Sequence, residues 1–556
     1  MTERLQPTTV KPMPAALEQS RESTFALRET VRVQKERVFR PIDFVLFFLL
    51  SLAGFAAIAN FFIAWFLNAD LSSHPVLFLL LTALLMLVLI NQQGRWYLLL
   101  PMRRPRPLRP SPGLRVAVVT TYVPDAEPRE MVEHTLEALV AIDYPHDTWL
   151  LDEADDPSIR RLCEQLGVHH FTRRGRPEYQ TENGRYKRGS KHGNYNAWLD
   201  AIGFERYDIL AAFDPDHVPH PSFLHHTLGY FRDDRVGYVQ SAQAYYNQGA
   251  SIVARGAAEE TYAYYSAVQM ASFGMGYPII VGSHNVHRMS VLREVGGFAA
   301  HDADDLLLTI HYRGAGWEGV YVPRILARGL TPVDWRSYLT QQRRWARSVL
   351  DIKCRRRHGH AKRLPLGSRI MSLLHGINFM HRSIVGTIAV IILVRLLAIG
   401  QPHNFLRSEM LAPLIVMVVV LQISELYRQR FYLDWHNERG MHWRSALLEF
   451  AKWPWLLMAL FDVLRNHAPS YAVTWKKKRN GLFEPFILYH GVLGMVVALA
   501  WMIGTLGAGD VHPFLRVCAA FVLATSAALV ATELVESPPP YDRRLWRPIR
   551  DPDARP

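Results

Sequence analysis

The apolar and polar positions of this 556-residue chain fall into long, separate blocks. Residues 41–67 and 75–91 are apolar over about the 20 positions that a helix needs to cross a ~30 Å hydrocarbon core. A long polar stretch follows, and four further apolar runs come after it: 381–400, 410–427, 487–507 and 513–533. The pattern predicts an integral membrane protein with six spans, two before the polar block and four after it.

Residues 445–465 are only partly apolar, because they include two acidic residues, a lysine and a proline. A seventh span here would put the basic segment 471–480 outside the cell, against the positive-inside rule. An amphipathic helix in the membrane interface is therefore the better interpretation. Residues 337–353 and 365–377 are also too polar to span, and we expect them to lie along the membrane surface.

The formal net charge of +13 lies largely beside the apolar runs. Basic residues follow the second run at 103–109 and precede the fifth at 476–479. This placement predicts that both termini and the polar block face the cytoplasm at the inner (plasma) membrane. Anionic lipid and nucleotide phosphates are the expected secondary partners, and we expect no nucleic-acid partner. The first forty residues are polar, so no cleaved signal is expected, and the three scattered cysteines predict neither a disulfide framework nor a zinc site.

Strand-like and helix-like segments alternate through the polar block from 113 to 345. A β-branched run at 114–124 is followed by a helical pattern at 128–142 and a second strand at 148–152. This order predicts a doubly wound, Rossmann-like α/β domain with a mostly parallel sheet and a ligand site at the carboxyl ends of its strands. The expected organisation is a cytoplasmic tail at 1–40, two transmembrane helices at 41–92, the cytoplasmic α/β domain at 93–350, interfacial and four transmembrane helices at 351–535, and a flexible tail at 536–556.

Acidic residues stand at three places where such a ligand site would lie. Taken singly, acidic residues after strands often cap helices or line solvated loops. Transfer from a sugar nucleotide, in contrast, needs a cation for the diphosphate, groups that hold the nucleotide, and a carboxylate that deprotonates the attacking hydroxyl. The candidates are Asp152 with Glu153, Asp214 and Asp216 with His217, and Asp304 with Asp305.

The segments around these carboxylates carry a family resemblance. They are KHGNYNAW at 191–198, VQSAQAYYN at 239–247, VGSHNVHR at 281–288 and QQRRW at 341–345. With them, residues 115–350 closely resemble the cellulose-synthase-like branch of the inverting, GT-A fold family 2 glycosyltransferases, which includes cellulose, chitin and hyaluronan synthases. Among these, the motifs are most similar to those of bacterial cellulose synthase catalytic subunits.

The resemblance implies roles for the acidic residues. Asp152 and Glu153 are expected to contact the nucleotide base or ribose. Asp214 is expected near the donor ribose or phosphate and, with Asp216, at the metal, for which oxygen ligands favour Mg²⁺ or Mn²⁺ over zinc. His217 is either a further metal ligand or a structural histidine.

Other motif positions are assigned by the same resemblance. The Q-x-x-R-W string, filled by Gln341, Arg344 and Trp345, marks processive synthases and contacts donor pyrophosphate and acceptor sugar. An amphipathic surface helix with solvated arginines is the alternative. The remaining expected contacts are Lys191, Gly193, Asn194 and Asn196 to the donor, and Gly282 and Ser283 to the acceptor.

The expected catalytic base is Asp305, because it precedes Trp317 at the spacing of the aspartate in the family's T-E-D motif. The segment reads Ala303-Asp304-Asp305 here, and the shorter Asp304 puts the identity of the sugar in doubt. Asp152 and Glu153 also differ from the family, which has two aspartates at these positions. No role is assigned to the long loop at 173–189.

Residues 471–476 resemble the gating loop of cellulose synthases, which implies donor contacts from Thr474 and Lys476. A β-branched pair beside a basic run is the plainer alternative. The stretch after residue 535 has no room for a cyclic-di-GMP-binding PilZ domain, so we expect no regulation through an attached domain of that kind.

The resulting expectation is a processive, inverting β-glycosyltransferase that polymerises a UDP-sugar and moves the polysaccharide across the membrane. UDP-glucose is preferred because QSAQAYYN resembles the cellulose-synthase version of that segment. The alternatives are a UDP-GlcNAc-using chitin- or hyaluronan-like synthase, a single-addition glycolipid transferase, and a non-catalytic membrane scaffold. The expected partners are the donor, the growing polysaccharide, the bilayer and an accessory or periplasmic export subunit.

Overall fold

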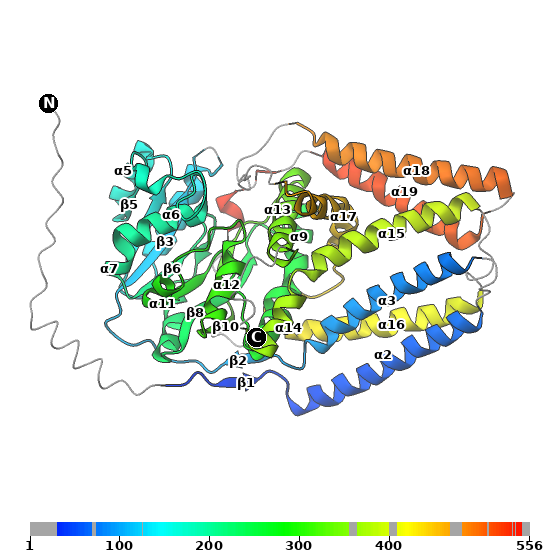
Figure 1. Cartoon of the computed structure of the whole chain (residues 1–556), viewed down its shortest axis with the longest axis horizontal. Coiled ribbons are helices and arrows are strands. Elements are labelled where there is room, and N and C mark those ends of the chain that lie inside the picture. The colour runs from blue at the N-terminus through cyan, green and yellow to red at the C-terminus, as the bar shows by residue number, and fades with distance from the viewer. Residues whose placement is uncertain are drawn as a thin grey trace, which may run out of the picture.

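The structure is a computed structural model in which an α/β domain stands beside a bundle of long helices (Figure 1). It describes residues 31–68, 74–124, 126–354, 364–399, 408–467, 481–508, 511–535, 538–539 and 541–546. The two parts correspond to the polar and apolar blocks of the sequence.

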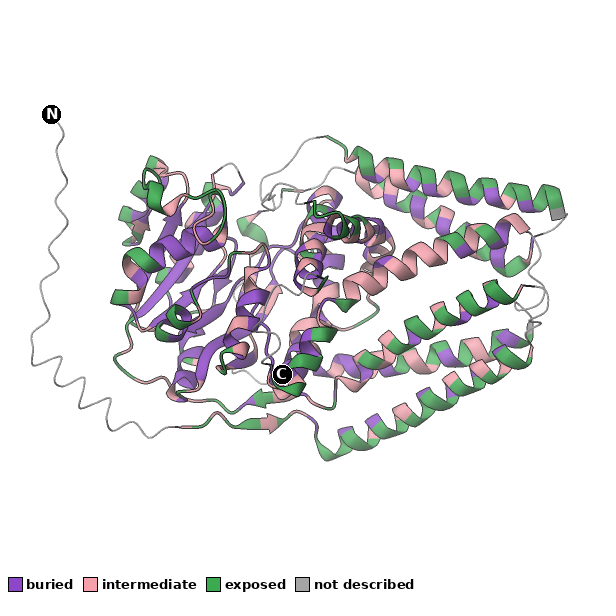
Figure 2. Cartoon of the chain, in the orientation of Figure 1, coloured by how far each residue is buried: buried purple, intermediate pink, exposed green. Residues whose placement is uncertain are grey.

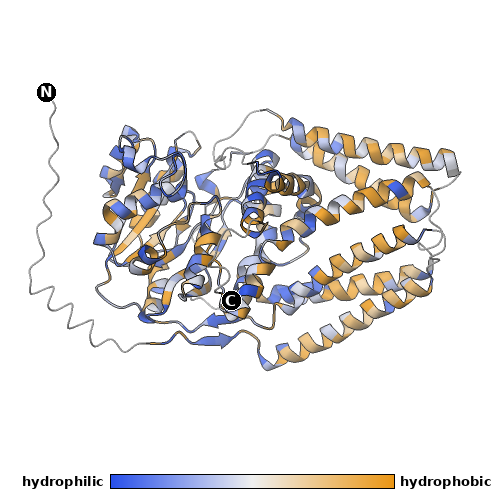
Figure 3. Ribbon diagram, in the orientation of Figure 1, coloured by the Kyte–Doolittle hydropathy of each residue, from blue (hydrophilic) through white to orange (hydrophobic). Residues whose placement is uncertain are grey.

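Six helices in the described part of the chain are long and apolar enough to cross a membrane. Only 17–28% of the most apolar window of each is buried, so most of their apolar side chains face outward, as Figures 2 and 3 show. An outward apolar surface of this length is what a bilayer requires. The long helices are α2 (Pro41–Leu67), α3 (Pro75–Tyr97), α15 (Ile377–Ile399, preceded by α14, Leu366–Leu374), α16 (Leu411–Arg428), α18 (Glu484–Ala508) and α19 (Pro513–Leu534).

Helix α17 (Trp443–Leu464) is not among these six. It packs against α9 (Ile252–Ala263), α13 (Trp335–Cys354) and α15, and thus lies between the α/β domain and the bundle. Its buried face includes Leu448, Ala451 and Trp455. The helix therefore joins the two parts of the molecule, as an interfacial amphipathic helix would.

Eight strands in the described residues form one twisted sheet at the centre of the α/β domain. Their order is β5-β4-β3-β6-β9-β8-β10-β7. The pairings β3–β4, β3–β6, β4–β5 and β8–β10 are parallel, whereas β9 runs antiparallel to β6 and β8, and β7 antiparallel to β10. The strands are β3 (Val116–Tyr122), β4 (Asp147–Asp152), β5 (His169–Phe171), β6 (Ile209–Ala212), β7 (Val218–Pro219), β8 (Val236–Tyr245), β9 (Asn285–Arg288) and β10 (Glu318–Gly329).

The sheet is mixed, but six of its eight strands run in one direction, in agreement with the mostly parallel sheet that the sequence predicts. Strands β9 and β7 run against these six. A short apolar run has the same composition in either direction, so strand direction is decided by the connections and not by the run itself. The parallel half, β5-β4-β3-β6, keeps the doubly wound arrangement. This half positions the predicted strand-end residues at one edge.

Both faces of the sheet are covered, because alternate residues of β3 enter different cores. Val116 and Val118 belong to one buried cluster, and Ala117 and Val119 belong to another. This alternation follows from the two-residue period of a strand. The remaining helices of the domain are α4 (Arg129–Val140), α5 (Pro157–Leu166), α6 (Lys191–Trp198), α7 (Phe204–Arg206), α8 (Phe223–Thr227), α10 (Gln269–Gly274), α11 (Met289–Glu294) and α12 (Asp304–Gly314).

Described segments near each end of the chain lie beside the α/β domain or the segment that leads into it. Strand β1 (Lys35–Arg37) pairs with β2 (Arg103–Pro105), so the segment before the first long helix lies beside the segment after the second. Residues 541–546 lie against α4, where the Arg543 guanidinium pairs with Glu137 at 2.8 Å. The Trp546 ring packs edge-on against His134. This part of the predicted flexible tail is thus packed on the domain.

Candidate functional site

The predicted site residues converge at the carboxyl edge of the parallel half of the sheet. Asp152 ends β4, and Asp214 comes two residues after β6. Asp304 begins α12, and Lys191 begins α6. Because β4, β3 and β6 run parallel, their carboxyl ends meet at the same edge and bring these side chains together.

Asp214, Asp216 and His217 form the cluster that best suits a cation. Their oxygen and nitrogen ligand atoms all lie within 4.8 Å of one another. The Asp214 side chain remains 31% exposed, whereas that of Asp216 is nearly buried. Carboxylate oxygens presented to one open side fit a hard divalent cation such as Mg²⁺ or Mn²⁺.

The hydrogen bonds of His217 indicate which of its two predicted roles the geometry favours. The Tyr265 hydroxyl donates to Oε1 of Gln243 at 2.9 Å, so the Gln243 amide nitrogen faces His217 Nε2 at 3.0 Å and donates to it. The proton of His217 is then on Nδ1, which lies 3.3 Å from an Asp216 oxygen. In this tautomer the Nδ1–H lies beside Asp216 without a hydrogen-bond partner in the described residues, and neither ring nitrogen is free to bind a metal, which favours the structural role.

Lys191 connects the acidic groups of the site. Its ammonium donates to Asp214 Oδ1 and to the carbonyl oxygen of Gly282. The carboxylates of Asp304 and Asp305 are also among its electrostatic partners. One cation therefore faces three carboxylates.

Three other residues of the K-x-G-N-x-N segment lie beneath the site. The Asn194 amide donates to the carbonyl of Leu151 at 3.2 Å. Asn196 exchanges two hydrogen bonds with the backbone of Phe298, both at 2.9 Å. A methyl group on Gly193 would come within 2.7 Å of the Arg173 guanidinium, so only glycine fits there. These residues fix neighbouring loops, and their predicted donor contacts remain predictions.

Asp152 and Glu153 are both engaged within the protein. Asp152 is fully buried and accepts hydrogen bonds from the backbone amides of Ala154 and Asp156 at 2.9 and 2.6 Å. Glu153 forms a two-pronged ion pair with the buried Arg173 guanidinium, at 2.7 and 2.9 Å. The pair thus shapes the turn after β4, and its predicted contact with the nucleotide remains a prediction.

Arg173 accounts for the shape of the loop at 173–189. Besides pairing with Glu153, its guanidinium donates to the carbonyl oxygens of Tyr179, Tyr186 and Lys187 at 3.0–3.1 Å. A buried guanidinium presents a rigid fork of donors and can tie several carbonyls to one point. The loop therefore closes over the end of β4 immediately before Lys191.

Gly282 and Ser283 lie next to the acidic cluster. Ser283 is buried, and its Oγ accepts a hydrogen bond from the Asp214 amide at 3.0 Å. A methyl group on Gly282 would lie 3.8 Å from Asp214 Oδ2 and 3.9 Å from Asp305 Oδ2. The two carboxylates therefore face the same point, and Gly282 leaves that point open. The predicted acceptor contacts of both residues remain predictions.

Asp304 and Asp305 form a close acidic pair in the first turn of α12. Burial, together with the neighbouring Asp305 carboxylate, raises the pKa of Asp304 to about 7, against the opposing effect of Lys191. Burial raises the pKa of Asp305 as well. Two adjacent carboxylates resist ionising together, so the pair holds on to a proton at a pH where isolated aspartates have lost it.

The Q-x-x-R-W residues lie on α13, which is tied to the segment just before Asp304. Arg347 pairs with Asp302 at 3.3 Å, and His301 lies 3.3 Å from Asp351. Gln341, Arg344 and Trp345 lie toward one side of α13, because Arg344 and Trp345 stand three and four positions after Gln341. The Trp345 side chain is 40% exposed, which is unusual for so large an apolar ring.

Two residues of the predicted site, Thr474 and Lys476, lie outside the described residues.

Comparison with known proteins agrees with this geometry. Residues 112–348 match the family model for glycosyltransferase-like family 2. These residues form a family 2 glycosyltransferase domain. The GT-A-like fold of this glycosyltransferase domain and the helices that flank it agree with the sequence-based expectation.

Two curated relatives are similar to parts of the chain. A probable glucomannan 4-beta-mannosyltransferase 3 of Oryza sativa subsp. japonica is 27% identical over 241 residues, which cover 41% of this chain and 42% of that protein. Cellulose synthase 2 of Novacetimonas hansenii is 27% identical over 310 residues, covering 52% of this chain and 18% of that protein. The chain thus matches less than half the length of either relative.

Solved structures show a more distant likeness. A mannosyltransferase from Pyrobaculum calidifontis, in complex with GDP-Man and Mn²⁺, has a TM-score of 0.48 at 16% identity and covers 71% of this chain and 99% of that chain. Glucosyl-3-phosphoglycerate synthase from Mycobacterium tuberculosis, in complex with Mn²⁺ and UDP-glucose, has a TM-score of 0.27 at 17% identity, covering 38% of this chain and 69% of that chain.

Several residues that shape the glycosyltransferase site were not predicted from the sequence. Arg173 lies in the loop to which no role was assigned, and Gln243 acts through His217. His284 is fully buried beside His217, with ring centres 4.5 Å apart, and has a left-handed φ of 56°. Burial lowers the pKa of His284 well below its ordinary value, so it adds no charge beside Asp216. No spacing in the sequence signals these contacts.

Proposed function

We propose that the chain is an inverting β-glycosyltransferase that extends a polysaccharide from a nucleotide-sugar donor. The observation that carries the proposal is the arrangement around Gly282. Asp214 and Asp305 face the same point, Lys191 bridges Asp214 to the Gly282 carbonyl, and α13 is tied to the segment before Asp304. Donor phosphates, an acceptor hydroxyl and a base can meet there.

The donor half of the site is formed by Asp214, Asp216 and Lys191. The two aspartates would hold a Mg²⁺ or Mn²⁺ ion, and that ion would neutralise charge on a diphosphate leaving group. Lys191 places a second positive charge beside Asp214, and Arg344 on α13 is the candidate for a third. Positive groups fixed where negative charge develops stabilise the transition state.

The acceptor half is formed by Asp305 and Trp345. The Asp305 carboxylate takes the proton of the attacking hydroxyl as its oxygen forms a bond to the anomeric carbon. The bond from that carbon to the phosphate oxygen breaks, and its electron pair leaves with the nucleoside diphosphate. Attack opposite the leaving group inverts an α-linked donor to a β-linked product. The exposed Trp345 ring offers an apolar face to the acceptor sugar.

The membrane helices favour a polymer product over a single-addition glycolipid. Among the described residues, six apolar helices flank the domain, four of them after it, and one sugar added to a lipid requires no passage through the membrane. We therefore propose a multi-pass protein of the plasma membrane whose catalytic domain faces the cytoplasm and whose polysaccharide product crosses the bilayer. An accessory export subunit remains a candidate partner.

UDP-glucose is the donor we propose first, which would make the product a β-glucan such as cellulose. The motif at 239–247 and the similarity to a cellulose synthase support it. A second candidate is a nucleotide-activated mannose donor, because an equally similar relative is named as a probable glucomannan 4-beta-mannosyltransferase.

The test is transfer by the purified full chain in nanodiscs with radiolabelled UDP-glucose, UDP-GlcNAc and GDP-mannose, each with Mg²⁺, Mn²⁺ or EDTA. We expect one donor to give a metal-dependent, high-molecular-mass product that a β-specific glycanase digests. Products limited to a single added sugar would establish the glycolipid alternative. Absence of transfer and hydrolysis with every donor would favour the scaffold alternative.

A further inference from the structure

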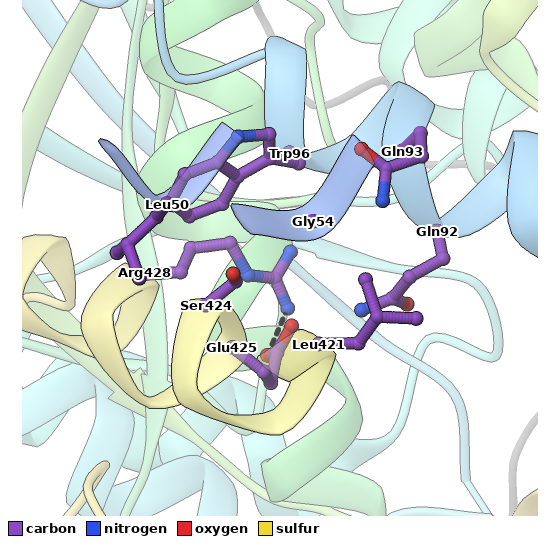
Figure 4. Close-up of a pocket in the computed structure, with 9 residues that line it drawn as sticks. All are labelled: Leu50, Gly54, Gln92, Gln93, Trp96, Leu421, Ser424, Glu425 and Arg428. Atoms are coloured by element: carbon purple, nitrogen blue, oxygen red, sulfur yellow. Dashed lines mark hydrogen bonds and ion pairs between the residues drawn. The ribbon is translucent and has the colours of Figure 1, made fainter. Parts of the chain in front are cut away.

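A polar recess lies within the helix bundle, away from the glycosyltransferase site. Figure 4 shows it between α2, α3 and α16. Its lining includes Gly54, Gln92, Trp96, Glu425 and Arg428. The last two turns of α3 and of α16 supply most of the polar groups, so the recess lies near the end of the bundle that faces the α/β domain.

Arg428 is the central group of the recess. Its side chain is only 5% exposed, and one terminal nitrogen pairs with Glu425. The Tyr432 hydroxyl also lies beside the guanidinium. Even so, Nε and Nη1 are buried and have no hydrogen-bond partner in the described part of the chain. A buried charged donor left unpaired is costly, so an acceptor from outside the chain would be strongly favoured.

The neighbouring charges leave an excess of positive charge. Arg95 on α3 has its own buried Nε without a partner among the described residues. The charged groups that act on Arg95 are two further arginines, Arg382 and Arg428, and two glutamates, Glu425 and Glu449. Three cations thus face two anions within the bundle. One adjoining pair adds no net charge: Lys452 and Glu260.

Gly54 leaves space beside this excess charge. The residue is buried, yet a methyl group built on it would meet no atom within 4 Å. The enclosed part of the recess is small, about 10 Å³, and the space reaches about 330 Å³ only when its open mouth is included. Figure 4 shows the Arg428 guanidinium extending toward Gly54, with the side chains of Gln92 and Gln93 on the other side. An anion entering here would meet charged and neutral donors together.

We propose that this recess binds a phosphate group, supplied by a phospholipid of the leaflet next to the catalytic domain or by free phosphate. An arginine fork matches phosphate oxygens, and glutamine amides can donate to the same group. Ionisable residues within membrane helices are rarely kept without a partner or a function. Headgroup phosphates lie at the depth where a transmembrane helix ends, so a lipid could supply the missing acceptor without leaving the bilayer.

Binding is tested by native mass spectrometry of the full, delipidated chain in phosphate-free detergent. The probes are phosphatidylglycerol, inorganic phosphate and an uncharged galactosyl diacylglycerol that lacks phosphate. We expect phosphatidylglycerol to bind about tenfold or more tightly than the uncharged lipid. Saturation by inorganic phosphate with no gain from the lipid would assign the site to free phosphate. Equal binding of all three probes would overturn the proposal.

Paired variants separate binding from folding. Glu425→Gln removes the internal anion, so it is expected to tighten phosphatidylglycerol binding, whereas Arg428→Gln is expected to weaken it about tenfold. Gly54→Leu fills the recess and is expected to block binding, whereas Gly54→Ala fits the open space and is expected to retain it. Arg395→Gln removes an exposed arginine near the opposite end of α15 and serves as the charge control. Unchanged binding in both Glu425→Gln and Gly54→Leu would refute the assignment even if Arg428→Gln fails to fold.

Discussion

At the scale of single residues, the acidic pair on α12 decides how the proposed reaction depends on pH. Burial and the neighbouring Asp305 carboxylate raise the pKa of Asp304 to about 7, and burial raises the pKa of Asp305. A base with a raised pKa is lost as the pH falls, so we expect kcat to begin to fall at a higher pH than it would with an ordinary aspartate as the base. Asp304→Asn removes one of the two like charges, which lowers the pKa of Asp305. The acidic limb of the kcat profile is then expected to move to lower pH, and an unmoved limb would contradict the coupling.

Replacement of the base itself has a different expected outcome. Asp305→Asn keeps the shape of the side chain and removes the proton acceptor. We expect transfer to fall by about 10²- to 10⁴-fold, while binding of the nucleoside diphosphate stays near that of the unchanged protein. Coupled assay of diphosphate release and calorimetric binding measure the two effects, with the exposed Asp234→Asn as the matched control. Normal turnover in Asp305→Asn would remove this residue from the mechanism.

At the scale of elements, the sequence predicts which segments form strands and where their polar ends meet. The β-branched run of β3 and the acidic ends of β4 and β6 were sufficient to place Asp152 and Asp214 at one edge. The antiparallel direction of β9 was not predictable, because its apolar residues carry no direction. Asn194 and Asn196 were recognisable as a motif, but their bonds to backbone carbonyls depend on loops brought together only in the fold.

The loop before α6 gives a prediction about packing. A methyl group on Gly193 would collide with the Lys187 carbonyl and come within 2.7 Å of Arg173. The backbone oxygen cannot turn away as a flexible side chain can, so Gly193→Ala is expected to destabilise the domain by about 1–3 kcal/mol. Thermal unfolding measures the change. Gly249→Ala, where a methyl group meets no atom within 4 Å, is the control and is expected to be neutral.

Helix α13 links the chemistry to the proposed polymer. An aromatic face can hold a pyranose without requiring one hydroxyl pattern, so Trp345 can bind each new chain end after the polymer advances. Trp345→Ala is expected to cost about 1–3 kcal/mol of acceptor binding. Release of the nucleoside diphosphate is then expected to persist while products become short, as measured by coupled assay beside gel analysis. Trp443→Ala, at a ring that is 51% exposed, is the control, and full-length product from Trp345→Ala would exclude this role.

At the scale of the whole molecule, the packing of both chain ends restricts the membrane topology. β1 pairs with β2, so the chain leaves and re-enters the same side of the bundle through α2 and α3. The segment 541–546 packs on α4 of the catalytic domain, so the four later spans also return to that side. Both contacts can form if an even number of spans precedes the domain in the sequence and an even number follows it. If α17 also crossed the membrane, the number of spans after the domain would be odd. Residues 541–546 would then lie on the opposite side of the membrane from α4.

Reporter fusions test this arrangement directly. Reporters placed after residue 20, near 180, at 435 and at 540 are all expected to report the cytoplasm. The positive-inside rule and the two packed ends lead to this result by independent routes, one from charge and one from contacts. Alkaline phosphatase and a fluorescent protein give opposite signals at each position, so failure to express is distinguished from location. A periplasmic signal at 540 with a cytoplasmic signal at 435 would mean that α17 spans the membrane, and the contact between Arg543 and Glu137 could not form.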